Sequence, residues 1–171
     1  LVCAMGQVME GDYKRIIITR SIQPVGRDLG FLPGDQSDKM NPWLAPITDN
    51  FKHAFKDKDQ TYFDMLVSKG TIEVAPLSYI RGRTFNDAIV IVDEAQNATI
   101  HELKTIITRV GNGSKVILLG DTDQIDTPYI NSFSNGLTVV IEKMKESQLT
   151  GHITLVKGQR SDIASYAADV L

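Results

Sequence analysis

Short apolar runs alternate with amphipathic stretches along most of the chain. Residues 14–19, 88–92 and 115–119 are rich in branched apolar side chains and have no regular polar face. Such runs predict strands that are buried on both sides, as in a parallel sheet. Further strands are expected at 71–75 and 152–156.

Helices are predicted between these strands from apolar positions that recur every three to four residues. The best-marked helix covers 99–110, where Thr99 and Glu102 have the spacing of a capping box and Gly111 marks the end. Residues 23–46 hold four of the six prolines, so they are expected to be mostly loop. Other helices are expected at 1–9, at 43–69 in two pieces broken near 56–60, at 134–145, and from Ser161 to the end.

Strands without a polar face that alternate with amphipathic helices predict an α/β domain with a sheet covered on both sides. The length of 171 residues suits one domain spanning 1–171. Parallel sheets of this kind carry their functional groups where the strands end. The residues that follow the predicted strands are therefore the first candidates for chemistry.

The composition narrows the class of protein. At 42% hydrophobic and 23% charged residues the chain reads as a folded globular protein. No apolar run approaches the roughly 18–20 residues of a membrane span, so no membrane partner is expected. The net charge of −3 gives no overall basic field for nucleic acid. The single cysteine, Cys3, favours a reducing cytoplasm, and the three histidines show no metal-ligand spacing.

Two adjacent carboxylates, Asp93 and Glu94, follow the run at 88–92. The first could hold a Mg²⁺ ion bound to a triphosphate, and the second could orient or deprotonate a water molecule. The alternative is an ordinary turn, where aspartate caps local backbone groups. The next strand, 115–119, ends in Gly120, Asp121, Thr122, Asp123 and Gln124. Gln124 could sense a γ-phosphate, or this segment could be only a polar turn.

Several basic and polar side chains are weaker candidates. Arg160 follows the predicted strand 152–156 and could stabilise charge on a transferred phosphate, as an arginine finger does. Arg20 and Gln23 follow the first long strand, and Arg81 and Arg83 form the densest basic spot. These four could contact a nucleic-acid backbone, or they could be solvated surface residues.

The motifs in this order resemble the superfamily-one helicase core, and more closely the PhoH-like family of phosphate-starvation-inducible ATPases. The resemblance covers nearly the whole chain. It rests on the segments ITRSIQPVG, FLPGD, KMNPWLAPI, RGRTFNDAIVIVDEAQN, GDTDQID and KGQRSDIA. It implies a RecA-like P-loop NTPase fold of three layers with a mainly parallel sheet, and an ATPase that uses ATP and Mg²⁺.

The resemblance also implies roles for individual residues. Asp93 would be the Mg²⁺ carboxylate and Glu94 the catalytic base. Gln124 would sense the γ-phosphate with help from Asp121, and Gln96 would belong to the same nucleotide site. Arg160 would be the arginine finger, and Arg20 would face nucleic acid or the edge of the nucleotide. The implied partner is RNA or single-stranded nucleic acid.

The sequence departs from the family pattern in two places. It contains no GxxxxGK[ST] phosphate-binding loop, and Ser21 stands where the family usually has proline. Residues 1–9 are expected to be the end of the helix that follows that loop, so the N-terminal strand and the loop are expected upstream of this sequence. A homo-oligomeric ring, in which Arg160 reaches a neighbouring nucleotide, would make a composite site.

Two other functions remain open from the sequence. Asp93, Glu94, Asp121 and Asp123 could gather into the acidic metal site of a nuclease or phosphatase, which needs no phosphate loop. The chain could also be a non-hydrolysing assembly module if the loop is truly absent. Activity on nucleic acid without ATP would distinguish the first alternative.

Overall fold

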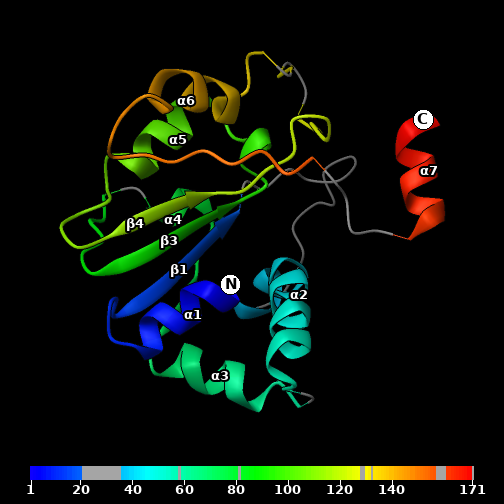
Figure 1. Cartoon of the computed structure of the whole chain (residues 1–171). Coiled ribbons are helices and arrows are strands. Elements are labelled where there is room, and N and C mark those ends of the chain that lie inside the picture. The colour runs from blue at the N-terminus through cyan, green and yellow to red at the C-terminus, as the bar shows by residue number, and fades with distance from the viewer. Residues whose placement is uncertain are drawn as a thin grey trace. The chain divides into compact units, whose positions relative to one another are not determined.

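Figure 1 shows the computed structural model of the chain. The structure describes residues 1–20, 36–57, 59–80, 82–127, 130–131, 133–156 and 161–170. The chain divides into two compact units, Leu1–Val140 and Ile141–Leu171. The single domain expected over 1–171 stays a prediction.

The first unit is built on a parallel sheet. Its strands are β1 (Arg15–Arg20), β2 (Ile72–Val74), β3 (Ala88–Asp93) and β4 (Lys115–Leu118), in the order β2-β1-β3-β4. Every neighbouring pair is parallel, and the register places Arg20 opposite Asp93. All strands therefore end at one edge, which confirms the sheet expected from the apolar runs.

One face of the sheet is covered by α1 (Val2–Met9), α2 (Gln36–Phe55) and α3 (Thr61–Ser68). Their apolar side chains pack on Ile16 and Ile18 of β1 and on Ile89 and Ile91 of β3. These strand residues are at most 5% exposed. Burying a side chain of this size contributes roughly 1.5–3 kcal/mol, so this cluster is a main source of the unit's stability.

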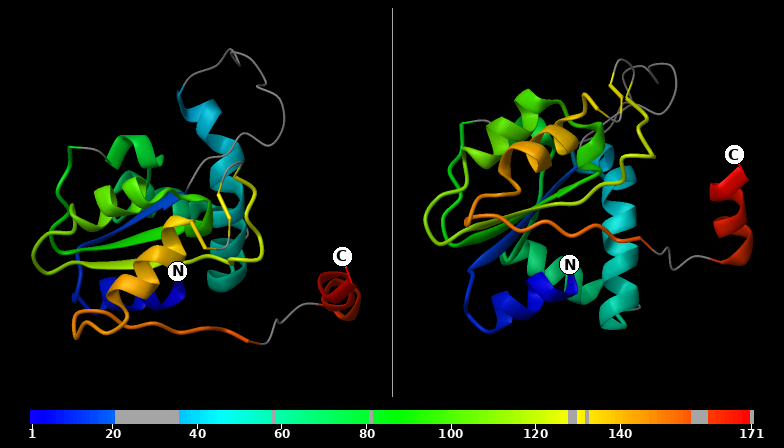
Figure 2. Two further views of the ribbon diagram at one scale, coloured as in Figure 1. Left: turned by 90° about the horizontal axis from the view of Figure 1, so that it is seen from above. Right: turned by 45° about the horizontal axis from the view of Figure 1, so that its top comes forward.

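The opposite face carries the alternate strand residues, of which Ile17, Val90 and Val92 are completely buried. Figures 1 and 2 show α5 (Ile100–Ile107) on the opposite side of the sheet from α1. Layers of helices on both faces give the three-layer α/β fold that was expected for a RecA-like P-loop domain.

The capping box predicted for α5 is present. The backbone N–H of Glu102 donates to Thr99 Oγ1 at 3.2 Å, and the N–H of Thr99 donates to Glu102 Oε2 at 2.7 Å. The helix ends at Ile107 and not at the expected residue 110, because Val110 forms a parallel β-bridge with Phe85. The bridge between Val110 and Phe85 thus takes the place of the last expected turn of the helix.

Helix α1 runs back along β1. A short connection joins the end of α1 to the start of β1, and Ala4 and Met5 pack in the same cluster as Ile16 and Ile18. In Figure 1 the N-terminus lies on the side toward which the arrow of β1 points. The N-terminal side of α1 therefore faces the edge where the strands end.

The other predicted elements of this unit are mostly confirmed, with one further correction. The helix at 1–9, the break near 56–60 and the strand at 71–75 appear as α1, the α2–α3 junction and β2. Residues 36–42, expected to be loop, belong to α2, and residues 23–35 lie outside the described part. The prolines at 42 and 46 do not exclude this helix because Ile47 and Phe51 anchor it in the core.

The second unit gives the other correction. Helix α6 (Gly136–Met144) matches the helix expected at 134–145, and the division between the units falls within it. Helix α7 (Asp162–Val170) confirms the helix expected after Ser161. Residues 152–156 form no strand, and Ile153, Leu155 and Val156 are 84–96% exposed. A strand needs a hydrogen-bonded neighbour, and the described part of this unit contains no other strand.

The remaining short helix is α4 (Leu77–Ile80), whose Ile80 is fully buried. Within the described residues, no helix is both long enough and apolar enough to cross a membrane.

Candidate active site

Two carboxylates mark the end of β3. Asp93 is the last residue of the strand, and Glu94 begins the short 3-10 helix η1 (Ala95–Asn97). Glu94 has φ 51° and ψ 41°, the left-handed region, which costs a non-glycine residue about 1 kcal/mol or more. The backbone N–H of Ala95 donates to the carbonyl of Leu119 at 2.8 Å. This bond ties the turn after β3 to the end of β4.

An arginine from the neighbouring strand meets these carboxylates. Arg20 Nη2 lies 2.8 Å from Glu94 Oε1, and both side chains are about one-third exposed. Burial raises the pKa of Asp93, the nearby Arg20 guanidinium opposes this effect, and the Glu94 charge adds to it. A carboxylate whose ionised form is disfavoured in this way is better satisfied when a cation sits beside it.

Gln96 links the two strand ends. Its Nε2 donates to Glu94 Oε2 at 2.7 Å and to the carbonyl of Gln124 at 2.9 Å. Its Oε1 accepts from the backbone N–H of Asp121 at 3.2 Å. The residue is 0% exposed. The nitrogen and the oxygen of the amide are therefore both hydrogen-bonded to protein groups, and Gln96 fixes the distance between Glu94 and the loop after β4.

The loop after β4 carries Asp121 and Gln124, both of which are exposed. Gln124 Nε2 donates to Asp121 Oδ2 at 2.6 Å, and the backbone N–H of Asp123 donates to Asp121 Oδ1 at 3.0 Å. Asp121 thus shapes its own loop and aims the side chain of Gln124. The two residues predicted to act together are in direct contact.

Asn97 is a structural residue that the sequence reasoning did not single out. It is 5% exposed, and its Oδ1 accepts from the N–H of Asp126 at 2.9 Å and from Thr127 Oγ1 at 3.2 Å. Gln96 is hydrogen-bonded to residues 121 and 124 of the loop after β4, and Asn97 is hydrogen-bonded to residues 126 and 127 of the same loop. The available signal was its position directly after Gln96 in the segment DEAQN.

Arg83 is not brought to this edge. Both terminal nitrogens of its guanidinium bind the carboxylate of Glu73 in β2, with Nη2 to Oε2 at 2.8 Å. Its Cζ also lies 5.1 Å from the centre of the Phe85 ring. The hydrogen bond from Arg83 lowers the pKa of Glu73, and that to Glu73 raises the pKa of Arg83. The expected site residues Gln23, Arg81 and Arg160 lie outside the described residues, as does Ser21, where the sequence departs from the family pattern.

The acidic metal site of the nuclease alternative gains no support. Among the residues that the structure describes, no three histidine, cysteine or acidic side chains are grouped so that they could hold a metal ion. Asp121 is turned to its own loop and to Gln124. The carboxylates of the site therefore suit a cation that takes its other ligands from a phosphate group or water.

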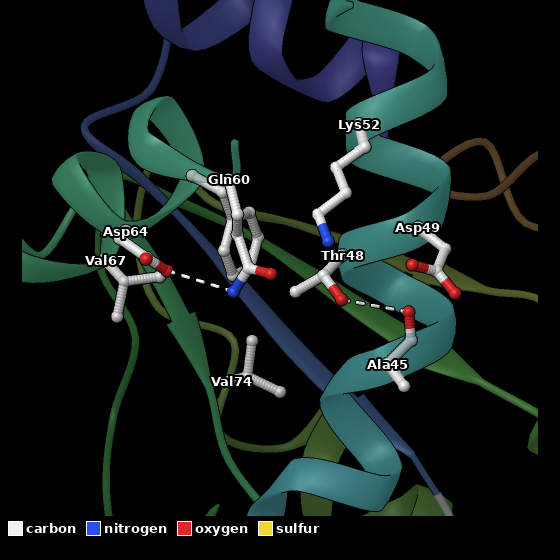
Figure 3. A pocket seen from close by; sticks show the side chains of 9 residues that line it. Ala45, Thr48, Asp49, Lys52, Gln60, Asp64, Val67 and Val74 are labelled. Carbon is white, nitrogen blue, oxygen red and sulfur yellow. Dashed lines mark hydrogen bonds between the residues drawn. The ribbon is translucent and has the colours of Figure 1, made fainter. Parts of the chain in front are cut away.

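A pocket of about 440 Å³ lies elsewhere in the first unit. Figure 3 shows it between α2 and α3, with Val74 of β2 at its base and Lys52 and Gln60 at its sides. None of the predicted site residues that the structure describes lines it. The pocket is thus separate from the polar groups at the strand ends.

Comparison with known proteins gives concordant results. The sequence model of the family described as PhoH-like protein matches residues 1–168. Protein PhoH2 of Bacillus subtilis is 48% identical over 162 residues, which are 94% of this chain and 37% of that protein. PhoH-like protein of Bacillus subtilis is 45% identical over 145 residues, which are 85% of this chain and 44% of that protein.

A third relative, Protein PhoH2 of Mycolicibacterium smegmatis, is 38% identical over 159 residues, which are 92% of this chain and 36% of that protein. The chain thus spans less than half the length of each of these relatives. The match nevertheless extends over almost all of its residues and includes the strand ends described above. The chain belongs to the PhoH-like family, a family of the nucleotide-binding P-loop class.

Proposed function

We propose that the chain is the catalytic core of a Mg²⁺-dependent ATPase. The observation that supports this most directly is the meeting of Asp93 and Glu94 with the Asp121–Gln124 loop at one edge of a parallel sheet. Carboxylates at such an edge suit a magnesium-bound triphosphate.

Each residue at this edge takes one role in the proposal. Asp93 holds the Mg²⁺ ion, because its half-buried carboxyl group has a raised pKa that a bound cation would offset. Glu94 accepts the proton of the attacking water. The metal supplies charge neutralisation on the phosphate oxygens. Gln124, aimed by Asp121, contacts the terminal phosphate, and Gln96 acts at the same site through its bonds to both strand ends.

The remaining parts of the proposal rest on the sequence resemblance. Arg160 acts as the arginine finger, within the chain or across the interface of a homo-oligomer. RNA or single-stranded nucleic acid is the partner, contacted by Arg20, Gln23 and Arg81, and the protein works in the cytoplasm. Arg83 is left out of this surface because Glu73 already engages its guanidinium.

The test is ATP turnover by the full-length gene product with Mg²⁺, with and without a single-stranded RNA. Glu94→Gln should lower kcat by about 100-fold or more, in the range of removing a general base, while nucleotide still binds. Glu146→Gln makes the same change at an exposed position of the second unit and should leave kcat unaltered. Normal turnover by Glu94→Gln would exclude Glu94 as the base.

A further inference from the structure

Glu94 is held by protein groups at both of its carboxylate oxygens. Oε1 accepts a hydrogen bond from Arg20 Nη2 at 2.8 Å, and Oε2 accepts one from Gln96 Nε2 at 2.7 Å. A residue that accepts a proton from water needs an oxygen that water can approach. These two hydrogen bonds therefore compete with water for the group that the proposed reaction requires.

The two hydrogen bonds to Glu94 differ in how readily a ligand could break them. Gln96 is 0% exposed and is fixed by further bonds to the loop after β4. Arg20 is the last residue of β1, and its side chain is 32% exposed. A ligand at the edge of the sheet can therefore reach the guanidinium but not the amide.

The chemistry of Arg20 decides which ligand would compete. A guanidinium binds phosphate oxygens through the same paired N–H groups that it offers to a carboxylate. A partly exposed ion pair is worth only about 0.2–1 kcal/mol. A phosphate group that arrives with additional contacts elsewhere can thus take Arg20 from Glu94 at small cost.

We propose that Arg20 is a switch residue: it restrains Glu94 while the two side chains are paired, and it frees Oε1 when a phosphate oxyanion binds its guanidinium. This inference rests on the proposed function, because it assigns regulation to the proposed base. Two sources share the chemistry, the phosphodiester backbone of a single-stranded nucleic acid and the triphosphate of the nucleotide itself. The experiment separates them by using one probe for each.

The test is a double-mutant cycle read by binding, which needs no turnover. The full-length protein and its Glu94→Gln, Arg20→Gln and double variants are titrated with a fluorescent single-stranded oligouridylate, and separately with a fluorescent non-hydrolysable ATP analogue. Removing the Glu94 charge should free Arg20 and tighten binding of at least one probe by about 1.4- to fivefold, the factor that about 0.2–1 kcal/mol permits. The Arg20→Gln background should abolish this gain.

Asp123→Asn is the matched control, because it removes one negative charge from the same edge without touching Arg20. A general loss of repulsion toward anions would tighten binding equally in this variant. Arg20→Lys keeps the charge but not the fork of N–H groups, and it should retain only part of the gain. It also serves as the second variant if Arg20→Gln does not fold, which a denaturation curve will show.

The outcomes are distinct. A gain with the oligouridylate assigns the switch to nucleic acid, and a gain with the ATP analogue assigns it to the nucleotide. A gain that equals that of Asp123→Asn, or that persists without Arg20, overturns the inference. Turnover of the wild-type protein is measured in parallel. Absence of turnover would remove the proposed function, whereas the binding cycle would still report whether Arg20 and Glu94 are coupled.

Discussion

The buried side chain of Gln96 accepts a hydrogen bond from the backbone N–H of Asp121 at 3.2 Å, although the two residues follow different strands. The same side chain donates to Glu94 at 2.7 Å. A residue in the middle of a polar motif therefore acts inside the protein and joins the proposed base to the loop of the proposed phosphate sensor. Rigid support of this kind is what places catalytic groups accurately.

Gln96→Leu should disturb catalysis more than nucleotide binding. The variant leaves the N–H of Asp121 and the carbonyl of Gln124 without their partner, which should lower the free energy of unfolding by about 1–3 kcal/mol. We expect kcat to fall roughly 10- to 100-fold through misplacement of Glu94, with KM for ATP within about twofold of wild type, since a 0% exposed residue cannot touch the nucleotide.

Steady-state kinetics and urea denaturation check this prediction. Gln148→Leu is the control, because it makes the same substitution at an exposed position. A raised KM with unchanged kcat in Gln96→Leu would mean that Gln96 binds the nucleotide directly.

Gly120→Ala should destabilise the same junction. A Cβ at this position would lie 2.6 Å from Gln96 Oε1 and 2.7 Å from Leu137 Cδ2. Overpacking of this kind typically costs 1–3 kcal/mol. Gly6→Ala in α1 is the opposite case, because its Cβ meets nothing within 4 Å, and it should stabilise by about 0.5–1 kcal/mol. Thermal unfolding of the two variants should therefore shift in opposite directions.

The sequence predicts the parts of the fold that depend on local patterns. The apolar run of β3 and the capping box of Thr99 and Glu102 are visible in the residues themselves, and both are present. Because parallel strands end at one edge, the sequence also predicts that Asp93 and Glu94 lie near the residues after β4. The contacts through Gln96 confirm that proximity.

Other features depend on contacts that no local pattern contains. Residues 152–156 have the composition of a strand, but the described part of their unit offers no neighbour. Helix α2 includes two prolines and is anchored by Ile47 and Phe51 in the core. Arg83 was a candidate for a nucleic-acid surface because it lies in the densest basic spot of the sequence, and nothing in the sequence marks Glu73, ten residues earlier, as its partner. Tertiary packing decides each of these cases.

Arg83→Met should reduce stability in a pH-dependent manner. The hydrogen bond from Arg83 lowers the pKa of Glu73 below its usual value, so the ion pair stabilises the protein above the ordinary glutamate pKa. This stabilisation is lost as the pH falls through the lowered pKa and Glu73 becomes protonated. We expect a loss of about 1 kcal/mol at neutral pH, the upper end for an exposed pair, and a much smaller loss in strong acid.

Urea denaturation at neutral and acid pH measures this difference. Lys14→Met breaks the more exposed pair with Asp87 and should have almost no effect at either pH. Affinity for oligouridylate should also be unchanged in Arg83→Met. A clear loss of affinity for oligouridylate would mean that Arg83 contacts nucleic acid after all.

Asp93→Asn should stabilise the protein without Mg²⁺ while removing ATP turnover. Burial raises the pKa of Asp93, so the native state binds its proton more tightly than the unfolded chain does. The free energy of unfolding therefore falls as the pH rises from the ordinary aspartate pKa through the raised one, and the ionised carboxylate carries this cost at neutral pH. Asparagine cannot ionise, so the variant should be more stable than wild type at neutral pH in a chelating buffer, with the gain shrinking in acid. Asp12→Asn, at an exposed turn, should not reproduce this gain.

Adding Mg²⁺ and ATP should make the wild type more stable than Asp93→Asn, because only the wild type gains the free energy of binding them. If Mg²⁺ and ATP stabilise both proteins equally, Asp93 is excluded as the metal ligand.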